Sequence, residues 1–245
     1  IDHVHAVDSF KRNLKALLEE FKQDKEKTDP RTIAYIGRMF MAEGNWQTAI
    51  PFLESLVKQS GWNDDKYFAY IQMSQCYQAL GKPTMAIACC NEALAINTQF
   101  PDAYLQLGYI YLDKKDYVKA VDWIMPGVVR QEPDTCMVYD PSFYNFQAKM
   151  AAAMALLGKG DAEQAMIWFN RAKQANPTHP DISKYEPAFL HALESHEYIR
   201  KLTWLVLYNK NNDPEKVKAL VEVIPKNLRH DERLWALRNA FAPSV

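Results

Sequence analysis

The side chains that could perform chemistry in this 245-residue chain are, first, its six histidines and four cysteines. His3 and His5 are separated by one valine. On an extended strand such residues point to the same side, which makes them weak candidates for metal ligands. The alternative interpretation is a frayed chain end that holds no metal.

The cysteines are Cys76, Cys89, Cys90 and Cys136, and none has the C-x-x-C spacing of a zinc or redox site. Cys89 and Cys90 fall in a helical pattern, where a reduced thiol behaves as a small buried hydrophobe. Reduced thiols favour a cytoplasmic location.

Motifs of common enzymes are absent. The sequence contains no GxGxxG, GxxxxGK[ST], GxSxG or HExxH, and no Asp-x-Asp. Lysine and arginine number 29 against 30 aspartate and glutamate, which argues against nucleic acid as a partner. No run of 18 apolar residues could span a membrane. We therefore expect a chain without catalytic activity or cofactor.

The elements that must position any site are helices arranged in a repeat. Residues 67–100 align with the sequence from Pro101 onward at a period of 34 residues. Matching positions carry similar side chains, namely Tyr70/Tyr104, Met73/Leu107, Ser74/Gly108, Tyr77/Tyr111, Ala86/Ala120 and Cys90/Ile124. This pattern resembles the tetratricopeptide repeat, in which small residues let two antiparallel helices pack closely.

The resemblance implies an all-α fold, a right-handed superhelix (an α-α solenoid) with atypical helical capping segments. The expected organisation is an N-terminal strand remnant, linker and capping helix at 1–29, repeats at 30–66, 67–100, 101–143 and 144–177, and a C-terminal helical capping or connector region at 178–245.

The resemblance also implies a concave groove lined by fixed positions of each first helix, which in the first repeat include Arg31, Ala34 and Arg38. The candidate partner-binding residues are Arg38, Ile71, Gln75, Gln78, Leu105, Tyr109, Leu112 and Asn145. The Lys/Asn/Arg set with which chaperone-binding members grip a C-terminal carboxylate is lacking. This groove could bind an apolar helix or peptide, or neighbouring helices of the same chain could cover it.

Residues 1–55 resemble a junction in bacterial and phage family 2 glycosyltransferases, where a His-containing strand ends the catalytic domain. An Arg-Asn-x-x-x-Leu-Leu helix follows, here residues 12–18. The resemblance implies a fragment of a larger enzyme, a non-catalytic scaffold for protein–protein contact, self-association or acceptor positioning. Its partner would be a protein or peptide, an adjacent catalytic domain or a second copy. The alternative is a free-standing adaptor or co-chaperone that binds a peptide in the groove.

Overall fold

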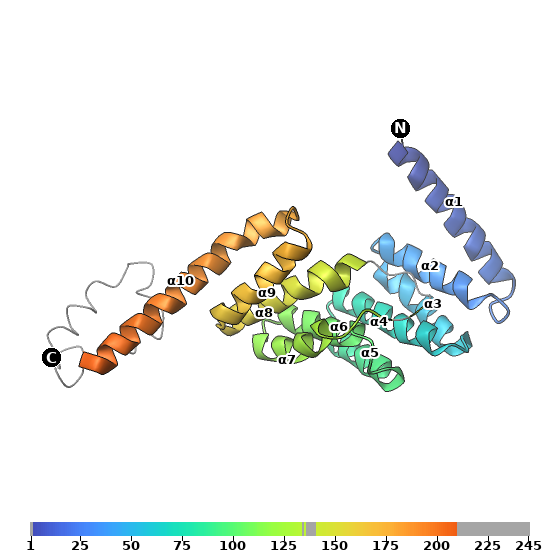
Figure 1. The fold of residues 1–245 in the computed structure, drawn as a ribbon. Coiled ribbons are helices and arrows are strands. Elements are labelled where there is room, and N and C mark those ends of the chain that lie inside the picture. Colours follow the sequence, from blue (N-terminus) through green and yellow to red (C-terminus); the bar gives the residue numbers. More distant parts are fainter. Residues whose placement is uncertain (1, 134, 136–140, 210–245) are drawn as a thin grey trace. The chain divides into compact units, whose positions relative to one another are not determined.

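The computed structural model describes residues 2–133, 135 and 141–209, and this part of the chain is built from helices and connecting loops (Figure 1). The helices are α1 (Asp2–Gln23), α2 (Pro30–Ala42), α3 (Trp46–Gln59), α4 (Asn63–Ala79), α5 (Pro83–Ile96), α6 (Asp102–Asp113), α7 (Tyr117–Val128), the π-helical turn η1 (Phe143–Gln147), α8 (Ala148–Lys159), α9 (Ala162–Ala175) and α10 (Pro180–Asn209). None of these helices is long and apolar enough to cross a membrane.

The predicted strand at the N-terminus is wrong, because the backbone is helical from Asp2 onward. His3 and His5 therefore lie on α1, where residues two apart do not face each other. Their side chains lie outside the described residues, as do residues 210–245 of the predicted C-terminal region.

The turns between paired helices share one backbone feature. Gly44, Gly81 and Gly160 have φ values of 72°, 68° and 90°, and Lys115 occupies the corresponding turn with φ 57°. This left-handed conformation is easily adopted by glycine and strained for most other residues. The repeated conformation reverses the chain between the two helices of a pair.

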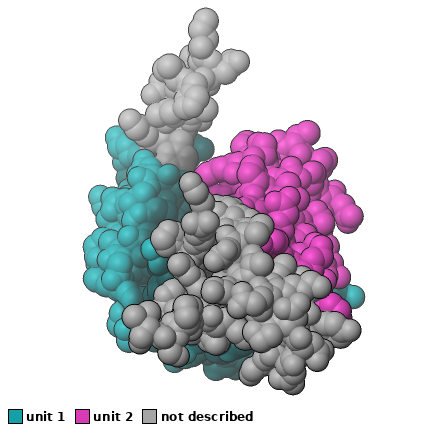
Figure 2. All heavy atoms as spheres, turned by 90° about the vertical axis from the view of Figure 1, so that its left-hand side faces the viewer, with its two compact units in different colours: residues 1–159 teal, residues 160–245 magenta. Residues whose placement is uncertain are grey.

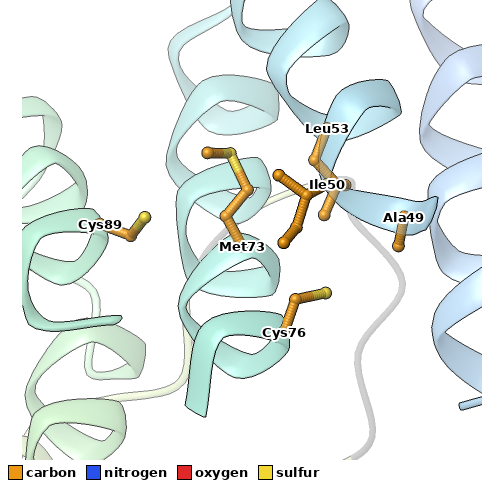
Figure 3. Close-up of a cluster of buried hydrophobic side chains, with 6 residues drawn as sticks. All are labelled: Ala49, Ile50, Leu53, Met73, Cys76 and Cys89. Carbon is orange, nitrogen blue, oxygen red and sulfur yellow. The ribbon is translucent and has the colours of Figure 1, made fainter. Parts of the chain in front are cut away.

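Successive helices pack in pairs, and each pair packs against the next pair along the chain. Within residues 1–159, α2 contacts α3, α4 contacts α5 and α6 contacts α7, while α3–α4, α5–α6 and α7–α8 join the pairs. A cluster of buried side chains links α3, α4 and α5, and its residues are Ala49, Ile50, Leu53, Met73, Cys76 and Cys89 (Figure 3). Each helix thus buries an apolar stripe against its sequence neighbours.

The chain divides into two compact units, residues 1–159 and 160–245, whose described residues are coloured teal and magenta in Figure 2. The boundary falls inside the expected repeat at 144–177. In the second unit α9 packs on α10, and the rings of Phe169 and Phe189 stack at a centroid distance of 4.4 Å. Lys173 Nζ adds an ion pair at 2.6 Å to Glu186 Oε1.

A buried carboxyl of the first unit joins the start of α6 to η1, and a neighbouring backbone group joins α6 to α4. Asp102, at the start of α6, accepts a hydrogen bond from the Tyr144 hydroxyl at 2.6 Å, and its Oδ2 atom has no partner among the described residues. The Tyr67 hydroxyl of α4 accepts one from the Ala103 backbone N–H next to it, at 3.0 Å. Burial raises the pKa of Asp102, and the Tyr144 hydrogen bond offsets part of that rise.

We expect Asp102→Asn to make stability less dependent on pH. Because the pKa of Asp102 is higher in the folded than in the unfolded state, the carboxyl stabilises the fold at acidic pH. That contribution is lost as the pH rises through the folded-state pKa. The asparagine oxygen can still accept from Tyr144. Urea unfolding from pH 4 to 8 should show the variant gaining stability over wild type as pH rises, whereas exposed Asp122→Asn as a control should show no such trend.

Candidate binding pocket at the start of α2 and α4

A pocket of about 620 Å³ lies within the first unit, between α2 and the start of α4. Its size is that of a ligand or peptide side-chain pocket. The lining residues are Asp29, Pro30, Arg31, Ala34, Tyr35, Arg38, Ser60, Gly61, Trp62 and Asp65. They come from α2 with its N-cap, from the loop between α3 and α4, and from the first turn of α4.

One face of α2 supplies most of the wall. Arg31, Ala34, Tyr35 and Arg38 follow the i, i+3, i+4, i+7 spacing that places residues on one side of a helix. Ala34 is buried, whereas Tyr35 is 53% exposed. The Arg38 guanidinium lies over the Tyr35 ring at 4.7 Å from its centroid. This stacking holds the charged group beside an aromatic surface.

The opposite wall is held by Ser60. Its buried hydroxyl donates to Asp65 Oδ2 at 2.6 Å and accepts from the Trp62 backbone N–H at 3.1 Å. These two bonds fix the loop so that Trp62, 58% exposed, stands at the pocket. A second aromatic surface therefore faces solvent there, and exposed aromatic side chains are typical anchors of binding sites.

The pocket is lined by two carboxylates and two guanidinium groups. Asp29 caps α2 by accepting from the Arg31 backbone N–H at 2.8 Å, and Asp65 accepts from Ser60. No carboxylate among the described residues lies within ion-pair distance of the guanidinium groups of Arg31 or Arg38. Asp29 and Asp65 likewise form no ion pair with a described residue, so the two carboxylates and the two guanidinium groups of the pocket balance in charge, and Arg38 has in addition its contact with the Tyr35 ring.

Arg38 is the one residue of the predicted groove set that lines this pocket, together with Arg31 and Ala34 of the expected groove face. Sequence reasoning missed Tyr35 and Trp62. The spacing of Tyr35 from Arg31 and Arg38 was the available signal for the first. No motif marked Trp62, which lies in an inter-repeat loop.

Two other predicted groove residues are placed differently, and the prediction that they contact a partner needs correction. Ile71 is 5% exposed and packs with Phe68 and Ala103, and Leu105 is 1% exposed. A Cβ built on Gly127 would lie 2.9 Å from Leu105 Cδ2, so Leu105 fills the space that this glycine leaves. Large side chains at these positions complete the packing of helices instead of lining a groove.

The remaining predicted groove residues bond within the chain or are half-buried. Gln78 donates to Asp113 and accepts from Gln106 Nε2 at 2.7 Å. The exposed Asn145 donates to Glu132 Oε1 at 2.8 Å. Gln75 and Leu112 are half-buried.

Tyr109 faces the start of the fourth repeat. Its ring lies 6.0 Å from that of Phe143 in η1, and its buried hydroxyl has no hydrogen-bond partner among the described residues. Burial raises the pKa of this hydroxyl. Thr135 also donates to Asp64 Oδ2 at 2.7 Å. The sequence left two alternatives for the groove: binding of a partner, or covering by other parts of the same chain. Near Tyr109 and Asp64 other parts of the chain cover it. The pocket beside α2 is not covered in this way.

The three cysteines in the described part of the chain, Cys76, Cys89 and Cys90, are free and buried. Burial raises the pKa of Cys76 and Cys89 to about 11 and that of Cys90 to about 12, so these thiols are poor nucleophiles at neutral pH. Within the described ranges no group of three or more His, Cys, Asp or Glu side chains could hold a metal ion.

Comparisons with known proteins agree with this architecture. Residues 69–100 and 101–125 match one model described as tetratricopeptide repeat, and residues 142–180 match a second. No curated protein matches the chain. The chain therefore contains tetratricopeptide repeats within residues 69–125 and 142–180.

Solved structures show the same fold. The crystal structure of MamA has a TM-score of 0.54 at 22% identity, over 72% of this chain and 94% of that one. TTC0263, a thermophilic TPR protein in Thermus thermophilus, has a TM-score of 0.54 at 18% identity, over 78% and 94%. YrrB, a TPR protein with an unusual peptide-binding site, has a TM-score of 0.50 at 14% identity, over 79% and 88%. The predicted all-α repeat class is confirmed.

Proposed function

We propose that this chain is a non-catalytic scaffold that binds a segment of another protein in the pocket beside α2. The observation that carries the proposal is the open pocket of about 620 Å³ with two exposed aromatic side chains. Repeat arrays commonly use such surfaces to hold partners. The free, buried thiols support a reducing compartment, and we propose the cytoplasm.

We propose further that the scaffold serves a family 2 glycosyltransferase, as a region of a larger polypeptide that contacts its catalytic domain or positions an acceptor. The support is the sequence resemblance over residues 1–55, in particular Arg12-Asn13 and the leucines that follow. The reading frame around this sequence tests the idea: a family 2 catalytic domain upstream would support it. A free-standing gene would favour the alternative of an adaptor, which needs only the open pocket to bind a peptide.

Site-specific photo-crosslinking tests the scaffold function. A photoreactive phenylalanine analogue replaces Tyr35 in the pocket, and in a control variant it replaces Met85, which is 48% exposed on α5. We expect one identifiable partner to crosslink at position 35 in cells of the source organism and not at position 85. Identical crosslinks at both positions, or none at position 35, would contradict the proposal.

A further inference from the structure

We propose that the pocket beside α2 binds a proline-rich segment without net charge, held in the extended polyproline II conformation. The inference rests on the proposed scaffold function and adds the chemistry of the bound segment. Its first support is the charge of the pocket walls, where Asp29 and Asp65 balance Arg31 and Arg38. A strongly charged segment of either sign would meet two groups of its own sign there, whereas a neutral segment meets no net repulsion.

Two aromatic rings form the apolar part of the pocket. Tyr35 of α2 and Trp62 of the loop before α4 both line it, and both expose more than half of their surface. The Arg38 guanidinium packs over the Tyr35 ring, and Ser60 ties down the backbone at Trp62. Flat aromatic surfaces of this kind are what proline rings pack on in polyproline II recognition, and the bound conformation is already favoured in the free segment.

The polar groups of the pocket favour a ligand that accepts hydrogen bonds. The Trp62 indole N–H and the guanidinium groups of Arg31 and Arg38 donate no hydrogen bond to another described residue. Asp29 Oδ1 and Asp65 Oδ2, by contrast, each already accept one. A proline-rich segment matches these unused donors, because proline has no N–H and the carbonyls of a polyproline II backbone make no internal hydrogen bonds.

Fluorescence anisotropy with the full chain tests the inference. The probe is a labelled peptide, blocked at both ends, of sequence Pro-Pro-Pro-Pro-Pro-Pro. One comparison peptide is built from D-proline, which keeps the composition and charge but reverses the hand of the helix. The other alternates glycine and alanine, which removes the rings and restores the backbone N–H groups. We expect both to bind on the order of tenfold more weakly or worse, and added salt to change the affinity for the L-proline peptide little, because neither surface carries a net charge.

Matched protein variants locate the binding. Tyr35→Ala and Trp62→Ala should each weaken binding of the L-proline peptide on the order of tenfold, because each removes a ring on which proline packs. Trp62→Phe keeps a ring and removes only the indole N–H, so it should weaken binding about threefold. The control is Trp204→Ala, which removes an indole that is 62% exposed on α10, in the other unit. It should leave the affinity unchanged, and circular dichroism checks that each variant is folded.

Several outcomes would overturn the inference. These are equal affinity for the L-proline and D-proline peptides, equal losses in Trp62→Ala and Trp204→Ala, or no binding at about millimolar protein. Tighter binding of an all-glutamate or all-lysine peptide of the same length would show that a charged segment is the ligand instead. A wild-type dimer that Trp62→Ala dissociates would identify a second copy as the occupant. If position 35 crosslinks a partner while the L-proline peptide fails to bind, the scaffold function stands and this inference falls.

Discussion

Gly108→Leu is expected to lower the free energy of unfolding by about 1–3 kcal/mol or more, the usual cost of overpacking a core. Gly108 lies where α6 and α7 meet, and a Cβ built on it would stand 2.1 Å from Ile124 Cγ1 and 3.3 Å from Ile124 Cβ. Ile124 is fully buried, and a β-branched side chain in a helix has essentially one χ1 rotamer available. The helices must therefore separate to admit any side chain at this position.

Urea unfolding of matched variants measures this effect. Gly61→Leu adds the same side chain at a position with no atom within 4 Å of its Cβ, and it should change stability little. Ile124→Ala removes the atom that causes the clash, so the double variant should lose less stability than the two single losses added together. Equal effects of Gly108→Leu and Gly61→Leu would show that the assigned helix pairing is wrong.

Phe189→Ala is expected to cost about 3–5 kcal/mol, as is typical when a fully buried aromatic ring is removed from a core. Phe189 is 1% exposed on α10 and stacks on the fully buried Phe169 of α9. Its removal leaves a cavity on the contact that holds these two helices together.

The neighbouring Leu190→Ala is the natural control, because Leu190 is 48% exposed on the same helix. Its loss should stay within about 0.5 kcal/mol. Thermal melting of the two variants separates the effects. A Leu190 variant as unstable as the Phe189 variant would mean that α10 packs by its other face.

The repeat itself could be predicted from sequence because its packing depends on residue size at fixed spacing. Gly108 and the small residue Ser74 one period earlier mark where paired helices approach most closely, and both are buried. The left-handed turns were equally regular, since three of the four carry glycine. Size and backbone freedom are properties of single residues, so a pattern of residue types reveals them.

The site was less predictable because exposure depends on neighbours. Leu105 holds a groove position in the repeat pattern, yet Gly127 on the paired helix leaves a space that Leu105 fills. The η1 turn is π-helical, and no sequence signal indicated that its Phe143 would stand against Tyr109. The N-terminal strand was inferred from a resemblance. The structure instead has a helix there, because α1 begins at Asp2.

The central claim is that a partner segment binds beside α2, at the pocket between Arg38 and Trp62. Amide hydrogen exchange of the full chain, with and without the partner captured at Tyr35, tests it most directly. The account predicts slower exchange concentrated in residues 29–38 and 60–66, which contain the pocket walls. Protection confined to α9 and α10, with exchange in those two segments unchanged, would contradict it.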